Sequence, residues 1–340
     1  MKLSRSWSAL SSVVVVFALA TLVILRPPWR YPPSNASQLP SFAFAVELEY
    51  DHGLCYVHNE TMSRPIANTI GNEAYRYAMR NLSAHCSNET STSNTDYGPV
   101  TQIVASLRSA TSASLRAEID RAAVVLPLDN PPYEADPCLH GLHRVFNSTG
   151  NKLERRVSAP MAVAWASGLA NSTFTGMESA FLVVGWEKSG FTTAIIYNDQ
   201  GVSDPYTFNQ SFFLGADHRA NTLHGLHRHC IPSVLAQLSK TMHADFTNLF
   251  HYSPLLPLRV ALYGEAARSQ GFKTWLLEAL DEDHDFGQID IQSTRLDGSL
   301  DFIASQGGVE YVWEIYQRWA DWEPEVTPCG QVLPLGSYPG

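Results

Sequence analysis

An acidic run at residues 281–285 (DEDHD) contains two aspartates, Asp281 and Asp283, separated by one residue. Carboxylate oxygens at this spacing can hold the divalent cation of a bound sugar nucleotide. The run follows residues 273–280, whose apolar residues repeat with helical periodicity, whereas such a metal-binding pair would be expected after an apolar strand. A solvated acidic loop is therefore the favoured interpretation. A metal-dependent glycosyltransferase remains an alternative.

The pentapeptide His-Gly-Leu-His-Arg occurs twice, at residues 140–144 and 224–228. Histidines three residues apart can face one metal ion from a helix. The central glycine weakens a helix, however, and no acidic partner lies at a fixed spacing. We therefore interpret these histidines as surface or partly buried residues. No metal ligand and no catalytic residue is assigned from the sequence.

Aromatic residues repeat every three positions near the C-terminus, at Trp313, Tyr316, Trp319 and Trp322. This spacing is typical of the buried face of a helix. The alternative is an exposed aromatic face that binds a protein partner. The first interpretation is favoured, and a protein partner stays open.

The elements that must position these groups follow from hydrophobic periodicity. Strands are expected at residues 42–48, 53–57, 123–126, 180–184, 192–197 and 258–263. Helices are expected at residues 100–122, 159–170, 234–242, 271–280 and 307–319. Residues 81–99 are polar and lack periodicity, so a loop is expected there. Strands that alternate with helices in this way predict an α/β body.

Seven segments, in this order along the chain, resemble motifs of one family. They are residues 43–57, 70–74, 122–127, 158–169, 184–197, 260–268 and 304–309. For example, VALYGEAAR at 260–268 is similar to Val-Leu-Val-Gly-Gly-Ser-Thr-Arg. The body thus resembles the actin-like ATPase superfamily, specifically the nucleotide-binding domain of seventy-kilodalton heat-shock chaperones. The resemblance implies a two-lobed, ribonuclease-H-like α/β architecture in reduced form, with a cleft between similar lobes.

The two phosphate-binding turns of that family are altered in this chain. Glu47 replaces the aspartate and Glu49 the first glycine of the first turn. In the second turn Gly185 stands where an aspartate belongs, and residues 187–189 (EKS) replace three glycines. Glycines there let backbone amides approach phosphate, and carboxylates would repel it. We therefore expect a pseudo-ATPase, with ATP and Mg²⁺ disfavoured; a residual ATPase is an alternative.

Three residues match the part of the family motif that contacts adenosine. Gly264, Arg268 and Gly307 occupy those positions. They are the cofactor-binding residues that the resemblance implies. No catalytic residue of the family is retained.

The first 26 residues contain an uncharged run of twenty residues between Arg5 and Arg26. As a helix, this run would span about 30 Å, the thickness of a bilayer's hydrocarbon core. A retained signal-anchor at residues 1–26 is favoured over a cleaved signal peptide, which would leave the protein secreted. A Pro-rich stalk at 27–41, a body at 42–320 and an irregular tail at 321–340 complete the predicted organisation.

Seven Asn-x-Ser/Thr sequons indicate a lumenal or extracellular body. The acceptor asparagines are Asn35, Asn59, Asn81, Asn88, Asn147, Asn171 and Asn209. The five cysteines suit an oxidising compartment, but their odd number leaves at least one free or intermolecular. The expected protein is a single-pass membrane glycoprotein of the endoplasmic reticulum, Golgi or cell surface.

The composition excludes nucleic acid as a partner. The 340 residues include 23 Lys and Arg against 33 Asp and Glu, a net charge of −10. Without residues 1–26 the charge becomes −13, and nucleic-acid binding requires a basic surface. The function expected from the sequence is a non-catalytic scaffold or binding protein of the secretory pathway.

Overall fold

The computed structural model describes residues 41–87, 96–127, 139–168, 179–188, 190–199, 202–211, 214–216, 230–235, 258–281, 289–292 and 302–320. The chain divides into one unit from Pro40 to Tyr316 and a second formed by residues 1–39 and 317–340. The unit from Pro40 to Tyr316 contains both sheets of the protein. It also contains the described helices, except for the last residues of the C-terminal one.

The first sheet is built from five strands in the order β3-β2-β1-β4-β5. These are β1 (Ala43–Leu48), β2 (His52–His58), β3 (Ser63–Ile70), β4 (Arg121–Leu126) and β5 (Lys152–Ser158). The strands β1, β2 and β3 form an antiparallel meander, and β4 and β5 continue the sheet in parallel with β1. Glu47 lies opposite Leu54 on β2 and Val125 on β4, so it is in the middle of the sheet.

The second sheet repeats the topology of the first. Its strands are β6 (Ser179–Trp186), β7 (Phe191–Asp199), β8 (Val202–Ser211), β9 (Leu258–Tyr263) and β10 (Ile289–Gln292). Their order is β10-β9-β6-β7-β8, again an antiparallel meander followed by two parallel strands. The β1–β2 and β6–β7 hairpin turns therefore occupy equivalent positions in the two sheets.

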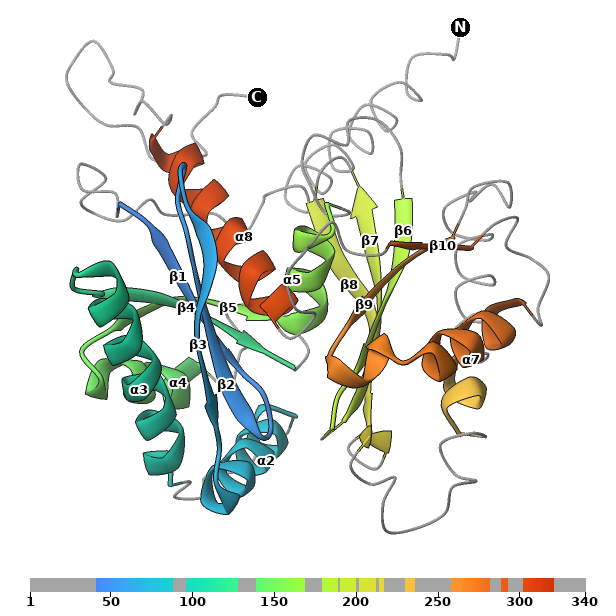
Figure 1. Cartoon of the computed structure of the whole chain (residues 1–340), viewed down its shortest axis with the longest axis horizontal. Helices are drawn as coiled ribbons and strands as arrows, with labels where there is room; N and C mark the ends of the chain where they lie inside the picture. The colour runs from blue at the N-terminus through green and yellow to red at the C-terminus, as the bar shows by residue number, and fades with distance from the viewer. Residues whose placement is uncertain are drawn as a thin grey trace, which may run out of the picture. The chain divides into compact units, whose positions relative to one another are not determined.

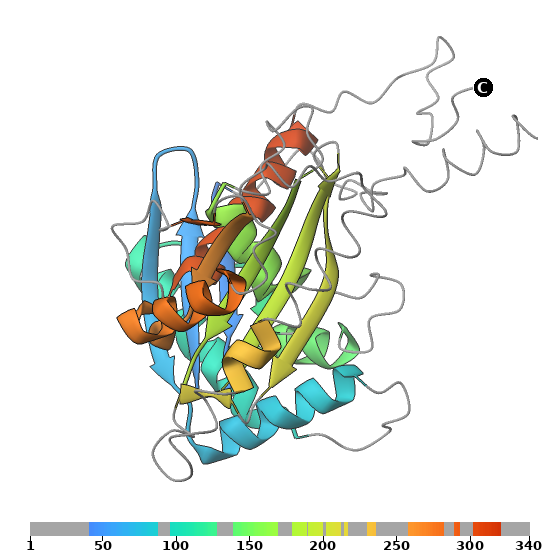
Figure 2. The ribbon, with the colours of Figure 1, turned by 90° about the vertical axis from the view of Figure 1, so that its right-hand side faces the viewer.

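Helices cover both faces of the sheets (Figure 1, Figure 2). They are α2 (Glu73–Ser87), α3 (Gly98–Leu115), α4 (Leu139–Ser148), α5 (Ala159–Ala166), η4 (Glu265–Arg268), α7 (Gln270–Asp281) and α8 (Ile303–Ala320), and residues 230–235 are also helical. The helices α2, α3 and α4 pack on one face of the first sheet, and α7 packs on the second sheet. A third core, built around α5 and the start of α8, contacts both sheets. The protein is thus a mixed α/β structure with two mixed sheets.

Successive side chains of the central strand β4 face different cores because helices cover both faces of the sheet. On β4, Val124 and Leu126 belong to the core under α2–α4, whereas Val125 faces the core around α5 and α8. Successive side chains of a strand point to opposite faces. Because both faces are covered, β4 is apolar at every one of these positions, as the continuous run AAVVL shows.

A close crossing of α5 and α8 holds the middle layer together. A Cβ atom at Gly307 would lie 1.6 Å from the carbonyl oxygen of Ala162, so any other residue would separate the helices. The apolar helix α5 begins after Ser158, whose side chain accepts a hydrogen bond from Met161 N. A helix that is apolar on all sides is stable only where it is enclosed by the protein, and in α5 residues 159–164 are buried.

The structure confirms several predicted elements and corrects others. The hairpins at 42–57 and 180–197, the strand at 258–263 and the helices at 271–280 and 307–319 are present. The loop predicted for residues 81–99 was wrong at both ends, because α2 continues to Ser87 and α3 begins at Gly98. Buried apolar residues from α2 show that tertiary packing stabilises a helix whose sequence is largely polar.

Two predicted helices extend too far. The helix predicted for 100–122 ends at Leu115, because Arg116 adopts a left-handed conformation with φ of 54°. Ile119 and Ala122 are buried beyond its end, so their apolar character reflects the core and not the helix. The helix predicted for 159–170 ends at Ala166, shortly before Gly168 with φ of 70°.

Some predictions fall on residues outside the described ranges. The predicted signal-anchor and almost all of the stalk belong to residues 1–40, and the tail begins at 321. Only the first residues of the helix predicted at 234–242 are described, within the helical segment 230–235. Among the helices of the described ranges, none combines the length and the hydropathy needed to cross a bilayer.

Candidate functional site

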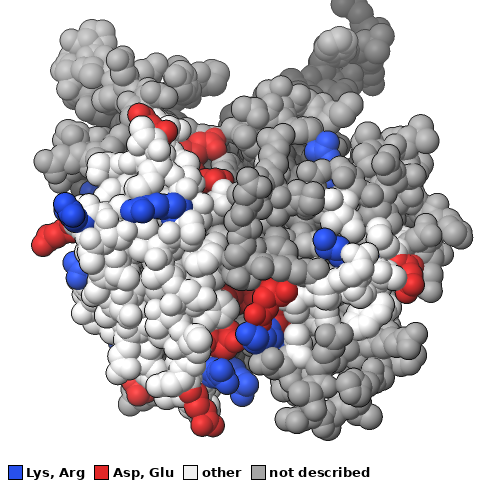
Figure 3. All heavy atoms as spheres, viewed as in Figure 1, with Lys and Arg blue, Asp and Glu red and all other residues white. Residues whose placement is uncertain are grey.

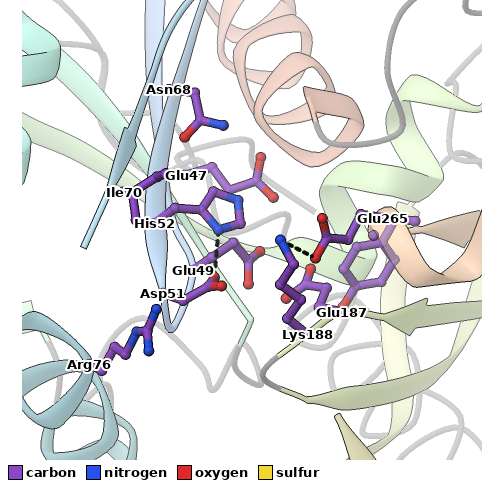
Figure 4. A pocket seen from close by; sticks show the side chains of 12 residues that line it. Glu47, Glu49, Asp51, His52, Asn68, Ile70, Arg76, Glu187, Lys188 and Glu265 are labelled. Atoms are coloured by element: carbon purple, nitrogen blue, oxygen red, sulfur yellow. Dashed lines mark hydrogen bonds and ion pairs between the residues drawn. The ribbon is translucent and has the colours of Figure 1, made fainter. Parts of the chain in front are cut away.

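A cavity of about 360 Å³ lies where the β1–β2 turn, the β6–β7 turn and the β9–η4 connection meet (Figure 4). Five carboxyl groups line it, from Glu47, Glu49, Asp51, Glu187 and Glu265. Three basic side chains, an amide, an aliphatic side chain, a phenol and a glycine complete the lining: His52, Arg76, Lys188, Asn68, Ile70, Tyr263 and Gly264. Figure 3 shows acidic and basic side chains gathered in a hollow at the lower middle of the face drawn. This is the strongest candidate for a functional site in the described residues.

The β1–β2 turn is fixed by contacts from α2. Glu49 N donates to His52 O at 2.9 Å, which closes the turn. The hydroxyl of Tyr75, fully buried, donates to Glu49 O at 2.7 Å and is 3.1 Å from His52 O. The backbone that carries Glu49 is therefore held by a side chain from another element.

The sequence before α2 explains how Tyr75 reaches that turn. Asn72 caps the helix, because its Oδ1 accepts a hydrogen bond from Tyr75 N at 2.9 Å. Gly71 N donates to Asp51 O at 2.7 Å. A Cβ atom at Gly71 would lie 2.0 Å from the Tyr75 ring, so glycine permits the close approach. The segment Gly-Asn-Glu-Ala-Tyr thus starts the helix and locks the turn.

The β6–β7 turn is held in a different way. Glu187 N donates to Gly190 O at 2.9 Å, and Ala216 N donates to Glu187 O at 2.8 Å. The β9–η4 connection packs against it at Gly264, whose φ is 84°. A Cβ atom there would lie 2.6 Å from Trp186 O and 2.7 Å from Glu187 Cγ. The contact of these two segments requires a glycine.

Glu47 is a buried carboxyl group near the end of β1, just before the first turn. Its side chain is 2% exposed, and its Oε2 accepts a hydrogen bond from Ser305 N at 2.8 Å. Ser305 lies in the first turn of α8, where backbone N–H groups have no helical partner and favour an anion. Burial, with a smaller contribution from the Glu187 charge, nevertheless raises the pKa of Glu47 from 4.5 to about 7.

Glu49 is the most isolated group of the cavity. Its side chain is 1% exposed, and within the described residues neither carboxyl oxygen has a hydrogen-bond donor. Its carboxyl neighbours Glu47 and Glu187 can hydrogen bond to it only by sharing a proton. Burial and the negative charge of Glu187 raise the pKa of Glu49 well above its usual value, and burial likewise raises the pKa of Glu187.

Two ion pairs lie at the edges of the cavity. Asp51 Oδ1 and His52 Nδ1 are 2.6 Å apart. Burial opposes both shifts, but this contact lowers the pKa of Asp51 and raises that of His52. Lys188 Nζ and Glu265 Oε1 are 3.0 Å apart on a more exposed side. The remaining carboxyl groups, Glu47, Glu49 and Glu187, lie deeper.

The structure brings together the three glutamates that the sequence analysis noted at the two turns. Of the three residues expected to contact adenosine, it places only one at the same cavity. Glu47, Glu49 and Glu187 line the cavity with Gly264. Gly307 lies at the crossing of α5 and α8 and is not among the lining residues. Arg268 ends η4, and its side chain lies outside what the structure describes.

The described parts of the other chemical motifs are not among the residues that line this cavity. The first His-Gly-Leu-His-Arg belongs to α4, and the second lies outside the described residues. Asp281 ends α7, as the helical interpretation of the preceding segment required, and Asp283 lies outside the described ranges. Within those ranges, no three His, Cys, Asp or Glu side chains are arranged to hold one metal ion.

The C-terminal aromatic repeat packs inward where it is described. Tyr316 is buried and hydrogen bonds to the Glu154 carboxylate. The half-buried Trp313 makes edge-to-face contacts with His58 and Tyr316. Nothing further is described for the side chain of Trp319 or for Trp322. The described half of this repeat is therefore packed against the protein.

The sequons are distributed over several elements. Asn147 is exposed on α4, Asn59 follows β2, Asn81 belongs to α2 and Asn209 belongs to β8. The acceptors Asn35, Asn88 and Asn171 lie outside the described residues. Among the cysteines described, Cys55 is a buried free thiol and Cys230 a half-buried one. Glycosylation stays a prediction.

Sequence reasoning missed the residues that shape the cavity from neighbouring elements. Tyr75 and Arg76 come from α2, and Tyr263 comes from the end of β9. The capping asparagine before Tyr75 is the local signal that could have located α2. A Cβ atom at Gly185 would lie 2.2 Å from the Tyr263 ring, a contact between distant segments that spacing cannot predict.

No protein-family model matches this chain, and a search of curated proteins finds no significant relative. The chemistry of the site must therefore be inferred from its geometry. Carboxyl groups face the cavity from both hairpin turns, where glycine amides would be needed to hold a phosphate. The arrangement is suited to a positively charged ligand or to retention of protons.

Proposed function

We propose that this protein is a non-hydrolytic, actin-like ATPase-type binding protein of the secretory pathway, held at the membrane by its N-terminal helix. The two sheets support the first part, because each has the same strand order and the same sequence of antiparallel and parallel pairings. Two similar lobes are what the resemblance implies. The membrane anchor and the lumenal location are supported by the uncharged N-terminal run and the sequons.

One observation carries the non-hydrolytic part of the proposal. Glu49 places a buried carboxyl group and Glu187 a half-buried one at the two turns that would have to hold a nucleotide's phosphates. Phosphoryl transfer depends on positive charge and amide donors around the transferred group. Carboxyl groups on both sides of the cavity oppose that requirement.

The test is a titration of the full chain with Mg-ATP and with Mg-ADP by isothermal calorimetry, together with a phosphate-release assay. We expect neither saturable binding nor phosphate release. Micromolar binding of either nucleotide, or turnover above a no-protein control, would contradict the proposal and favour a residual ATPase. A chaperone nucleotide-binding domain serves as the positive control for both assays.

The location has its own test. Protein made in eukaryotic cells is treated with an endoglycosidase and compared by gel mobility with a variant in which Asn147 is changed to Gln. We expect the treated protein to migrate faster and the variant to have lost one glycan. An unchanged mobility after treatment would exclude a lumenal body.

A further inference from the structure

We infer that the cavity between the two hairpin turns binds a small organic cation, an alkyl ammonium or guanidinium compound, with the Glu49 carboxylate as its principal counter-charge. This inference rests on the proposed function, because it assigns a ligand class to the same cavity. A linear aliphatic diamine is the simplest ligand that fits the arrangement.

The unpartnered carboxyl group of Glu49 points to a ligand. It is almost completely buried, and within the described residues nothing donates a hydrogen bond to either oxygen. In Figure 4 it extends from the first turn toward the side where Glu187 and Lys188 lie. Ionised Glu49 would be strongly unfavourable here without a donor, and a bound N–H cation would supply both the opposite charge and the donors.

When they are ionised, the carboxyl groups around Glu49 favour a cation. The charged and titratable side chains that line the cavity with it are Glu47, Asp51 and His52 on the hairpin, Arg76 on α2, Glu187 and Lys188 on the second turn, Tyr263 at the end of β9, and Glu265 on η4. With Glu49, five carboxyl groups oppose three basic ones. His52 and Lys188 already contact Asp51 and Glu265 at the edge of the cavity. An excess of carboxyl groups therefore remains at its base.

The cavity also offers apolar surface for a carbon chain. Ile70 lines its mouth with a side chain that is 79% exposed, and the buried Tyr263 forms part of a wall. The volume of about 360 Å³ lies at the lower end of the range for small-molecule sites. A bare metal ion would need several ligands converging on one point, and the described residues contain no group of three so arranged. The geometry thus favours an organic cation.

Protons take the place of the cation when the cavity is empty. Burial raises the pKa values of Glu47, Glu49 and Glu187, so at neutral pH the empty cavity retains protons on its carboxyl groups. A cation binds to the ionised form and must displace them. Binding should therefore release protons and strengthen as the pH rises through about 7, the pKa of Glu47.

The experiment is a calorimetric titration of the full chain with 1,4-diaminobutane, with butane-1,4-diol as the uncharged control. We expect saturable binding of the diamine, no binding of the diol, and about tenfold weaker diamine affinity per pH unit below 7 for each proton displaced. Titrations in buffers of different ionisation enthalpy would measure the released protons directly.

A matched pair of variants assigns the binding to this cavity. Glu49→Gln should reduce diamine affinity by at least about tenfold, because it removes the charge and keeps the shape. Glu278→Gln, on the exposed face of α7, should leave the affinity unchanged. Glu187→Gln serves as a second variant if the first does not fold, with the same expected loss.

Three outcomes would overturn the inference. They are the absence of diamine binding at any pH, binding that Glu49→Gln and Glu187→Gln leave intact, and saturation of the site by MgCl₂ or CaCl₂ but not by the diamine. A parallel Mg-ATP titration separates this result from the proposed function. Nucleotide binding would contradict the proposed function, whereas failure of the diamine alone would contradict only the assignment of the ligand.

Discussion

The β1–β2 and β6–β7 turns occupy equivalent positions in two sheets of the same topology, but different contacts hold them. The first turn is clamped by Tyr75, which comes from α2 and donates to a backbone carbonyl of the turn. The second turn is closed by its own Glu187–Gly190 hydrogen bond and packs against the left-handed Gly264. Repeated topology thus fixed where the turns lie, and neighbouring elements determined what each one presents.

Two turns with the same place in their sheets can therefore be held by different contacts and still line one cavity. Both turns carry carboxyl groups into one cavity, and burial raises the pKa of those groups on both sides. The first turn is deeply enclosed, whereas the second has an exposed ion pair between Lys188 and Glu265. Substitutions around the first turn should therefore change the free energy of unfolding more than substitutions at the exposed side of the second turn.

The largest effect is expected at the clamp on the first turn. Tyr75→Ala should lower the free energy of unfolding by about 4 kcal/mol, because it removes a fully buried aromatic ring. Tyr75→Phe should cost about 1 kcal/mol for the lost hydroxyl. The control is Tyr77→Ala on the same helix, whose side chain is 68% exposed and should matter by less than about 0.5 kcal/mol. Urea unfolding measures all three, and equal effects of the two alanine variants would show that the turn is not clamped.

The second effect concerns the pH dependence of stability. The pKa of Glu47 is raised to about 7 in the folded protein, so the folded state holds this proton more tightly than the unfolded state. This stabilisation is complete below about pH 4.5 and is lost as the pH rises to about 7, a change on the order of 3 kcal/mol. Glu47→Gln retains an acceptor for Ser305 N and should flatten the stability profile between pH 5 and 8. A profile as steep as that of the unmodified protein would contradict the assignment.

The third effect tests Gly264, the glycine of the β9–η4 connection that packs against the second turn. Gly264→Ala should destabilise the protein by about 2 kcal/mol, because φ is 84° and the added Cβ would meet Trp186 O. Gly271→Ala is the control, since its Cβ would meet nothing within 4 Å in α7. That variant should be more stable by about 0.5 kcal/mol through helix propensity. Thermal unfolding measures the stability of both variants. If Gly264→Ala left the stability unchanged, the backbone around residue 264 would be able to relax around the added Cβ atom.

The smallest effect is expected at the exposed side of the second turn. Lys188→Ala removes the ion pair with Glu265, whose two side chains are about half exposed. Such pairs contribute less than about 1 kcal/mol and weaken with salt. We expect a loss of at most about 0.5 kcal/mol that disappears in 1 M NaCl, measured by urea unfolding. A loss as large as that of Gly264→Ala would remove the contrast between the two sides of this turn.

The predictability of the fold varied with the strength of local signals. The strands β1, β4, β6 and β9 are rich in apolar residues, in continuous runs on β4 and β6, and were located from the sequence. The edge strand β3 was missed because its residues are mostly exposed or half-buried and show no alternation. The end of α3 was also missed. Glycine or asparagine usually occupies the left-handed position that ends a helix, but in α3 this position is Arg116.

The sequence by itself placed Glu47, Glu49 and Glu187 in two segments expected to form hairpins, and it led us to expect altered phosphate-binding turns there. It also determined the uncharged N-terminal run, the sequons and the acidic charge. The tertiary structure decided that these three carboxyl groups share one cavity, because both sheets pack against the core around α5 and α8, which brings together two hairpins more than a hundred residues apart. It also decided that Glu49 has no described donor, since burial and hydrogen bonding depend on every element around a side chain.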